Sequence, residues 1–274
     1  MNDFLIKLYE VLSTKGDTPT LFGKYHLSWI AIVAIISVAL VLFFSKVSDK
    51  NARIIIASAW VVMLIMELLK QLINSMTVSG NEITWGYNMG VFPYEFCSTP
   101  LYVLPIAAFM KDGKKRDTAI VFLSSFAIIG GLTVYIVADS VLTGHLFVDF
   151  QSMLHHGIQI FIGIYIAARY GKKLTKENFN SATLTFLFMT YLAILFNVMF
   201  TKIFEIIGSY IKINLFFVSP YVRYIPSLLQ GLGLDKLPYP IFLLGFIILF
   251  VAVAYLVMKA LSLLTKKANY TKKA

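Results

Sequence analysis

Cysteine is nearly absent from this sequence, since Cys97 is the only one among 274 residues. A single cysteine excludes an intramolecular disulfide, so the fold cannot depend on one. Charged residues are also scarce, at 14% of the chain, and the mean hydropathy is +0.78. Soluble domains carry about a quarter of their residues as charges. This composition therefore excludes an ordinary soluble protein and predicts an integral membrane protein.

Motifs that bind soluble cofactors or metal ions are missing as well. The sequence has no glycine-rich phosphate loop and neither His-x-x-x-His nor Cys-x-x-Cys spacing, which are typical of nucleotide and zinc sites. We therefore predict no cofactor and no metal site. The net charge is +10, but the basic residues gather in alternate loops between apolar segments. That placement indicates membrane topology and not a nucleic-acid partner.

Seven apolar stretches of roughly 20 residues are each long enough to cross a bilayer. No long polar linker separates them, so we expect an all-α, polytopic domain of seven transmembrane helices over residues 25–264. We expect residues 1–24 to form a short helix on the membrane surface. Residues 265–274 are expected to form a basic cytoplasmic tail. The expected spans are 25–44, 54–73, 93–110, 118–138, 152–168, 183–205 and 239–262.

The orientation follows from the distribution of Lys and Arg over the loops. Most of them lie in the loops after the first, third and fifth spans and in the C-terminal tail. Because such loops stay in the cytoplasm, the N-terminus is predicted to be outside and the C-terminus inside. The same basic residues could bind anionic lipid headgroups.

With this orientation, the polar residues of the spans gather in the outer half of the membrane. Ionisable groups at this depth normally face a bundle interior or a wet cavity, which predicts a shared outward-facing pocket. The alternative is a structural Glu67–Lys70 pair on one helix, with other side chains reaching the interface. The polar residues are His26, Glu67, Lys70, Gln71, Asn74, Glu95, Cys97, Asp139, His155, His156, Gln159, Asn197, Lys202 and Glu205.

The segment from Val91 to Leu101 carries the candidate nucleophile. A helix that begins near Pro93 would place Cys97 about one turn in, where the helix dipole stabilises a thiolate. The alternative is an inert, buried cysteine in a membrane helix kinked by proline. Each later proline removes the helical donor of a carbonyl four residues earlier, and the pairs are Pro100 with Phe96 and Pro105 with Leu101.

Two adjacent histidines, His155 and His156, are candidates for a catalytic base. Neighbouring residues on a helix point about 100° apart, so we expect only one of them to face a given centre. A thiol with a histidine from another helix is typical of nucleophilic acyl chemistry. A hydrogen-bonded packing role is the alternative for each ring.

The connection from Ser209 to Pro238 is long for a compact bundle. Its apolar pieces predict short amphipathic or re-entrant segments that form a lid over the outer cavity. An interfacial loop that covers helix ends is the alternative.

Several separated motifs occur in an order typical of one family. They are Phe22-Gly-Lys-Tyr-His26, Phe92-Pro-Tyr-Glu-Phe-Cys97, His156-Gly157, Asn197 and Leu228-Leu-Gln-Gly-Leu-Gly-Leu-Asp-Lys-Leu-Pro-Tyr-Pro240. With them the chain resembles the YwaF-type integral membrane proteins, the bacterial relatives of transmembrane protein 164, over residues 22–262. The resemblance implies a multi-pass protein of the bacterial plasma membrane. One position differs, because Glu95 stands where we expect a histidine.

The eukaryotic branch of this family is described as a cysteine-dependent acyltransferase that remodels ether phospholipids. The resemblance implies that Cys97 accepts the acyl chain, that His156 is the base, and that membrane lipids are the substrates. A transporter or sensor that binds a small polar or anionic ligand in the same pocket is the alternative. Candidates for orienting groups or for binding substrate are Glu95, His155, Glu67, Lys70, Asn197, Lys202 and His26.

Overall fold

The computed structural model describes residues 2–137, 141–223 and 231–270, and these are mainly helical. Asp139 and residues 228–230 of the last motif lie outside the described residues. The α-helices are α1 (Asn2–Leu12), α2 (Lys24–Ala39), α3 (Asp49–Asn74), α4 (Thr99–Phe109), α5 (Lys114–Leu123), α6 (Phe126–Ile136), α7 (Leu146–Tyr170), α8 (Lys176–Ile206) and α9 (Tyr239–Tyr270). A π-helix, η1 (Leu40–Phe44), continues α2, and the short 3-10 turns are η2 (Met89–Val91), η3 (Phe96–Ser98), η4 (Gly171–Lys173), η5 (Leu215–Phe217) and η7 (Leu234–Lys236).

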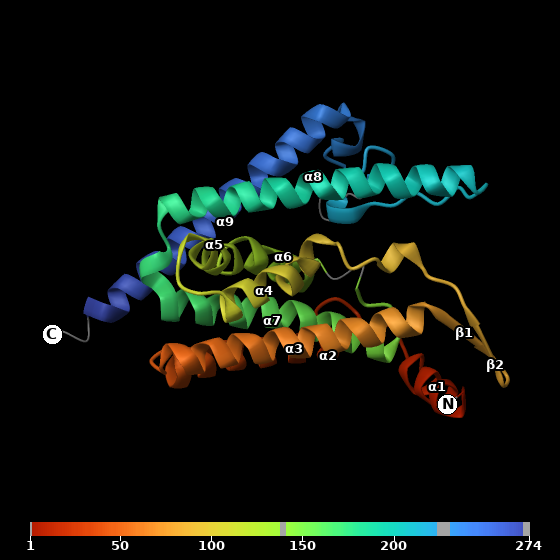
Figure 1. Cartoon of the computed structure of the whole chain (residues 1–274), viewed down its shortest axis with the longest axis horizontal. Helices are drawn as coiled ribbons and strands as arrows, with labels where there is room; N and C mark the ends of the chain where they lie inside the picture. The colour runs from red at the N-terminus through yellow and green to blue at the C-terminus, as the bar shows by residue number, and fades with distance from the viewer. Residues whose placement is uncertain (1, 138–140, 224–230, 271–274) are drawn as a thin grey trace.

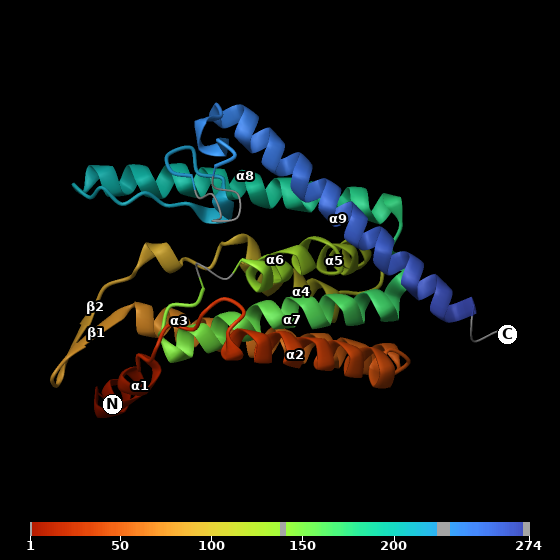
Figure 2. The same ribbon diagram turned by 180° about the vertical axis from the view of Figure 1, so that it is seen from behind.

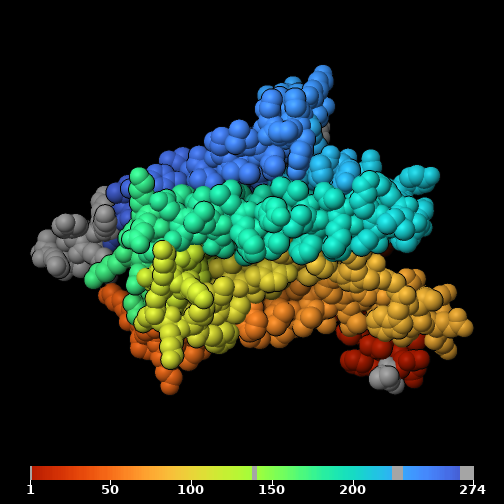
Figure 3. All heavy atoms as spheres, turned by 45° about the horizontal axis from the view of Figure 1, so that its top comes forward, coloured from red at the N-terminus to blue at the C-terminus, as the bar shows by residue number. Residues whose placement is uncertain are grey.

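The helices stack in layers (Figure 1). Helices α4 to α7 occupy the middle, with α2 and α3 on one side and α8 and α9 on the other, and the reverse view shows the same order (Figure 2). Helix α9 runs obliquely along α8, and the two cover one face of the bundle (Figure 3). A hairpin of β1 (Met76–Ser79) and β2 (Glu82–Trp85) projects beyond the helices at one end.

Among the described residues, five helices are long and apolar enough to cross a membrane. They are Lys24–Phe44, Asp49–Asn74, Lys114–Ile136, Lys176–Ile206 and Tyr239–Thr265. The all-α, multi-pass membrane architecture expected from the sequence is therefore confirmed. The remaining two expected spans correspond to the short apolar helix Phe96–Phe109 and to α7, so the count of seven stays a prediction.

Helix α7 lies in the interior of the bundle, in contact with α2, α3, α5, α6 and α9. A helix that is covered by protein need not present apolar side chains to lipid, which explains how α7 carries several buried polar residues. Glycines allow the close contacts. A Cβ atom on Gly131 would lie 2.7 Å from the His156 carbonyl oxygen, and one on Gly163 would lie 2.7 Å from the Leu123 carbonyl oxygen.

The expected span 118–138 corresponds to the membrane-length segment Lys114–Ile136, in which the helix breaks between α5 and α6. At the break, the hydroxyl of Ser124 donates to the Ile120 carbonyl and that of Ser125 to the Val121 carbonyl, each at 2.6 Å. Serine hydroxyls that bond back to the preceding turn replace backbone donors and favour a bend. The two serines thus supply hydrogen-bond donors to the last carbonyls of α5, which lie in a buried part of the span.

The prediction that prolines open the helix is confirmed for Pro105 only, because Pro100 lies in the first turn of α4 and interrupts no helical hydrogen bond. The carbonyls of Phe96 and Leu101 both have side-chain partners. The Thr99 hydroxyl donates to the Phe96 carbonyl at 2.9 Å, and the Trp60 indole of α3 donates to the Leu101 carbonyl at 2.9 Å. A buried carbonyl without a donor would cost free energy. Trp60 therefore ties α3 to the proline-distorted turn of α4.

The expected helix start near Pro93 is wrong, because regular structure begins with the 3-10 turn at Phe96. Glu95 has an extended backbone, with φ of −76° and ψ of 161°. Tertiary hydrogen bonds hold this stretch: the Tyr102 hydroxyl donates to the Pro93 carbonyl at 2.5 Å, and the Glu95 side chain binds a distant loop. Cys97 consequently lies in the turn just before α4 and not one turn inside the helix.

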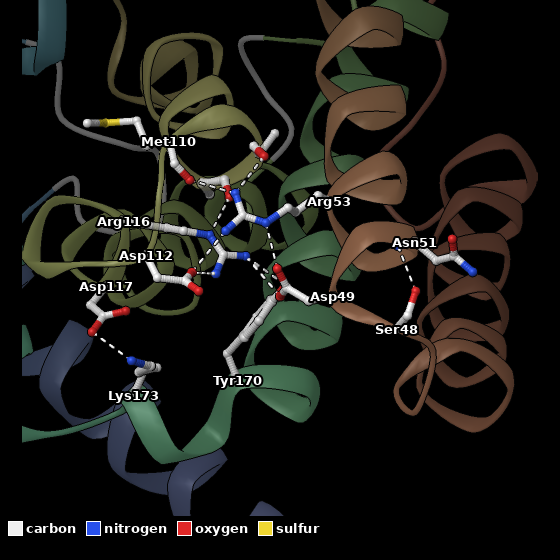
Figure 4. A network of polar contacts seen from close by, with 12 residues as sticks. Ser48, Asp49, Asn51, Arg53, Met110, Asp112, Arg116, Asp117, Tyr170 and Lys173 are labelled. Atoms are coloured by element: carbon white, nitrogen blue, oxygen red, sulfur yellow. Dashed lines mark hydrogen bonds and ion pairs between the residues drawn. The ribbon is translucent and has the colours of Figure 1, made fainter.

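The two ends of the bundle differ. Helix α1 and the hairpin lie at one end, and the last turns of α9 lie at the other (Figure 1). The predicted surface helix is confirmed as helical, and its apolar Phe4 and Val11 are exposed. At the opposite end, Asp49, Arg53, Asp112, Arg116 and Tyr170 form a polar network between α3, the loop after α4, α5 and α7 (Figure 4). We call these five residues the inner network.

Candidate functional site

A cavity of about 180 Å³ lies toward the hairpin end of the bundle, between α3, the turn before α4 and the first half of α7. It contains five of the residues expected from the sequence to form an outer pocket. Its lining residues are Glu67, Lys70, Cys97, Ser98, Val141, Thr143, Val148, Gln151, Ser152, His155 and His156. Residues far apart in the chain therefore meet at one cavity, as the polar pattern predicted.

Cys97 is held in the cavity wall through its backbone. Its carbonyl oxygen accepts hydrogen bonds from two side chains of α7, Nε2 of His155 at 2.9 Å and Nε2 of Gln159 at 2.8 Å. Its side chain is partly buried. These two bonds tie the backbone of the cysteine turn to α7, the helix that carries both histidines.

His156 presents a basic nitrogen. Its Nδ1 lies 2.6 Å from the Ser152 carbonyl oxygen, one turn earlier on α7. A carbonyl only accepts hydrogen bonds, so in the neutral ring Nδ1 carries the proton and Nε2 keeps a lone pair. Nε2 is buried and has no hydrogen-bond partner within the described parts of the chain. The ring can therefore take a proton from a group in the cavity.

His155 has the opposite tautomer by the same argument. Its Nε2 donates to Cys97, so its buried Nδ1 carries the lone pair, and that atom also lacks a partner among the described residues. Both rings line the cavity, with centroids 5.5 Å apart. The expectation that only one histidine would face the site is therefore wrong, because the cavity wall is broad enough for two adjacent imidazoles.

The polar stripe expected on the second span is confirmed on α3. The Lys70 ammonium lies 2.9 Å from the Glu67 carboxylate, and Gln71 Nε2 lies 2.6 Å from the other carboxylate oxygen. Gln71 also receives a hydrogen bond from the Tyr87 hydroxyl at 2.7 Å. Burial, together with the Glu67 carboxylate, raises the pKa of Tyr87, which keeps this phenol protonated as a donor.

His26 and Lys202, which the sequence placed in the same pocket, do not line the cavity. His26 is fully buried on α2 and stacks on Tyr135 of α6, with ring centroids 6.0 Å apart. Lys202 is more than half exposed near the end of α8 and pairs with Glu205 at 2.6 Å. The structure thus gives His26 a packing position and Lys202 a surface position.

Glu95 and Asn197 also do not line the cavity, and Asn197 is fully buried whereas Glu95 is partly buried. Their polar atoms bind the backbone of residues 215 and 216 in the connection between α8 and α9. That connection enters the bundle, since Leu215 and Phe216 are almost fully buried. Part of the stretch therefore lies inside the bundle, while a re-entrant membrane segment or a lid over the cavity stays a prediction.

Sequence reasoning missed four polar residues of the cavity wall, which are Ser98, Thr143, Gln151 and Ser152. The spacing of four residues between Ser152 and His156 places them on one helix face and could have identified Ser152. Thr143 carried no such signal, because it lies in the loop before α7. Within the described residues, no group of three His, Cys, Asp or Glu side chains could hold a metal ion.

Comparison with known proteins identifies the family of this chain. A family model described as the TMEM164 family matches residues 21–258, which is most of the chain. The search of curated proteins and the search of solved structures each found no match. The expected resemblance is confirmed at the level of this family, while the YwaF-type subgroup stays a prediction. The match contains every element that forms the cavity, and the chain therefore belongs to the TMEM164 family.

Proposed function

We propose that this multi-pass membrane protein is a cysteine-dependent acyltransferase that acts on phospholipid acyl chains at the outer leaflet. One observation carries the proposal: Cys97 lies in the same cavity wall as His156, whose lone-pair nitrogen is buried and without a protein partner in the described chain. A thiol and a base on neighbouring elements are what acyl transfer through a thioester requires.

The reaction would proceed in two balanced steps. In the first, His156 Nε2 takes the thiol proton as the Cys97 sulfur attacks an acyl ester carbonyl, and the ester oxygen leaves with that proton. The products are a thioester and a lysolipid. In the second, a lipid hydroxyl attacks the thioester, His156 takes the hydroxyl proton, and the sulfur leaves and is protonated. The enzyme is regenerated with the acyl chain on the acceptor.

The size and charge of the cavity support a lipid substrate whose tails stay outside. A cavity of about 180 Å³ is too small for a whole phospholipid, so it would take only the reacting ester and part of a headgroup. The acyl chain would remain among the apolar helix surfaces. The Lys70 ammonium in the cavity wall is placed to bind a lipid phosphate.

The proposal includes the topology. We assign seven crossings to α2 with η1, α3, η3 with α4, α5 with α6, α7, α8 and α9, with the N-terminus outside a bacterial plasma membrane. The odd count agrees with α1 and the last turns of α9 lying at opposite ends of the bundle (Figure 2). The basic loops support the direction. The cavity then opens toward the outer leaflet.

A transporter or sensor for a small anionic ligand is the second candidate. The observation that favours it is the partly buried Lys70 ammonium in the cavity wall, since a cation at such a position can bind an anion. This function would use Lys70 but would not need the thiol. Thiol dependence therefore separates the two candidates.

Intact-protein mass spectrometry tests the proposed function. Purified wild-type protein, incubated with phospholipid, should gain one acyl chain that hydroxylamine removes, and the Cys97→Ala variant should gain none. The control is the same incubation with Cys97→Ala in matched amounts, with thermal unfolding to show that it is folded. A wild-type protein that stays unmodified and transfers no acyl chain would contradict the covalent mechanism.

A further inference from the structure

A short stretch of the connection between α8 and α9 turns back into the bundle, and we call residues Asn214–Ser219 the re-entrant segment. Leu215 and Phe216 are 1% and 0% exposed. A buried, non-helical backbone needs partners for its polar groups. The side chain of Asn197 supplies two, because its Oδ1 accepts from the Leu215 N–H at 2.7 Å and its Nδ2 donates to the Leu215 carbonyl at 3.0 Å.

Glu95 supplies the next contact. Its carboxylate accepts a hydrogen bond from the N–H of Phe216 at 3.1 Å, across 121 residues of sequence. Two further hydrogen bonds hold the segment. Within it, the Asn214 side chain accepts from the Ser219 N–H at 3.0 Å, and from α9 the Tyr239 hydroxyl donates to the Val218 carbonyl at 2.9 Å. Side chains from three distant parts of the chain thus hold one short backbone.

The re-entrant segment has an unfavourable backbone conformation. Phe216 and Phe217 have φ values of 58° and 59°, in the left-handed region that residues with a Cβ atom rarely adopt. Such conformations persist only where surrounding contacts over-determine them, and they cluster at functional sites. The bonds from Glu95 and Asn197 are the contacts that impose this geometry.

The strained geometry places the Phe216 ring against the turn that carries the thiol. Its ring centroid lies 5.5 Å from that of Phe96 and 5.6 Å from that of Tyr94. Phe96 directly precedes Cys97, whose carbonyl is bonded to His155 and Gln159 of α7. The cysteine turn is therefore held between polar donors on one side and the re-entrant segment on the other.

We propose that Glu95 and Asn197 are positioning residues that clamp the re-entrant segment onto the Phe96–Cys97 turn and so hold Cys97 in the cavity wall. Glu95 acts here as a hydrogen-bond acceptor of fixed length, and neither its charge nor a proton transfer is needed. The inference does not depend on acyl transfer, because it concerns the position of the thiol alone.

The test uses the rate at which a membrane-permeant maleimide alkylates the purified full-length protein. Because Cys97 is the only cysteine, the mass of the adduct reports this thiol alone. We expect Glu95→Ala to react about tenfold faster than wild type, since the loss of one buried hydrogen bond releases the turn to that extent. Glu95→Gln should react at the wild-type rate, because its amide oxygen reaches the same N–H.

Glu95→Asp is the decisive companion. Its carboxylate keeps the charge but is one methylene shorter, so it should react like Glu95→Ala. Glu82→Ala, which removes an exposed glutamate of the hairpin, is the matched control and should leave the rate unchanged. A wild-type rate for Glu95→Ala would overturn the proposal. So would Glu95→Asp behaving as wild type while Glu95→Gln behaves as Glu95→Ala, since charge would then be what matters.

Asn197 provides an independent arm should Glu95→Ala fail to fold. Asn197→Asp keeps the acceptor for the Leu215 N–H and removes the donor to its carbonyl. We expect it to raise the alkylation rate, and Asn197→Ala to raise it further. Equal rates for both variants and wild type would overturn the clamp. The acyl-adduct experiment on wild type is unaffected by these results, so the two proposals fail separately.

Discussion

The two ends of the bundle each hold a cluster of polar side chains, and the clusters differ in how completely their groups are paired. In the inner network, the Arg116 guanidinium binds the Ala107 carbonyl, Asp49, Asp112 and the Tyr170 hydroxyl at distances of 2.6 to 3.3 Å. The Tyr170 hydroxyl in turn donates to Asp49 at 2.7 Å. Figure 4 shows these side chains converging from α3, α5 and α7.

The cavity cluster is incomplete by comparison. Nδ1 of His155 and Nε2 of His156 are buried acceptors that find no partner among the described residues. Buried polar groups normally have partners, and each exception needs an explanation. A polar cluster that satisfies itself stabilises the fold, whereas one with open acceptors is suited to a ligand that brings its own donors. By this comparison, the inner network is suited to stabilise the fold and the cavity cluster is suited to bind a ligand.

His156→Ala should produce the largest effect on function and a small effect on stability. General-base catalysis contributes about 10² to 10⁴ in rate, so acyl transfer should fall by at least about 100-fold. Transfer of a labelled acyl chain between phospholipids measures this. His145→Ala is the control, because His145 lies at the start of α7 and does not line the cavity. Unchanged transfer in His156→Ala would assign the base to another group.

Arg116→Met should have the opposite profile and lower stability more than any cavity variant. It removes the centre of the inner network and leaves the Ala107 carbonyl without its side-chain donor, while Asp49 and Asp112 keep only Arg53 as their cation. The loss of these bonds should cost about 1 to 3 kcal/mol. The midpoint of denaturation in detergent measures it, with Lys115→Met, an exposed neighbour on α5, as control. A loss of stability no larger than that of Lys115→Met would break the contrast between the two ends.

Part of the cavity wall was predictable from the sequence. Five of its residues lie at similar depths on the predicted spans, and this similar depth was enough to predict that they meet. They are Glu67, Lys70, Cys97, His155 and His156. The position of Pro105 likewise predicted that the Leu101 carbonyl would lack its helical donor. Such predictions succeed because helical spacing and span length are local properties of the chain.

The roles of Glu95 and Asn197 were not predictable in this way. Both bind the re-entrant segment, and the Glu95 bond joins residues 121 positions apart. No local pattern encodes a left-handed backbone at Phe216, because such a conformation is imposed by tertiary contacts. The predicted helix start was wrong for a related reason, since Glu95 has an extended backbone and its side chain is bonded to the distant Phe216.

Two ion pairs of identical spacing give the finest test of the contrast between buried and exposed polar groups. Glu67–Lys70 and Lys202–Glu205 are both three residues apart on a helix, at 2.9 and 2.6 Å. The Glu67 side chain is 5% exposed, whereas both side chains of the second pair are about half exposed. Water screens the second pair strongly and the first only weakly.

Double-mutant cycles on the two pairs should therefore give different coupling energies. We expect about 1 to 2 kcal/mol for Glu67→Gln with Lys70→Met, because Lys70→Met leaves a buried carboxylate without its cation. For Glu205→Gln with Lys202→Met we expect no measurable coupling, because water screens this pair. Denaturation midpoints of the four variants in each cycle measure both couplings. Equal coupling would show that burial does not govern these pairs, and it would remove the electrostatic basis for treating Lys70 as a cation held ready for an anionic headgroup.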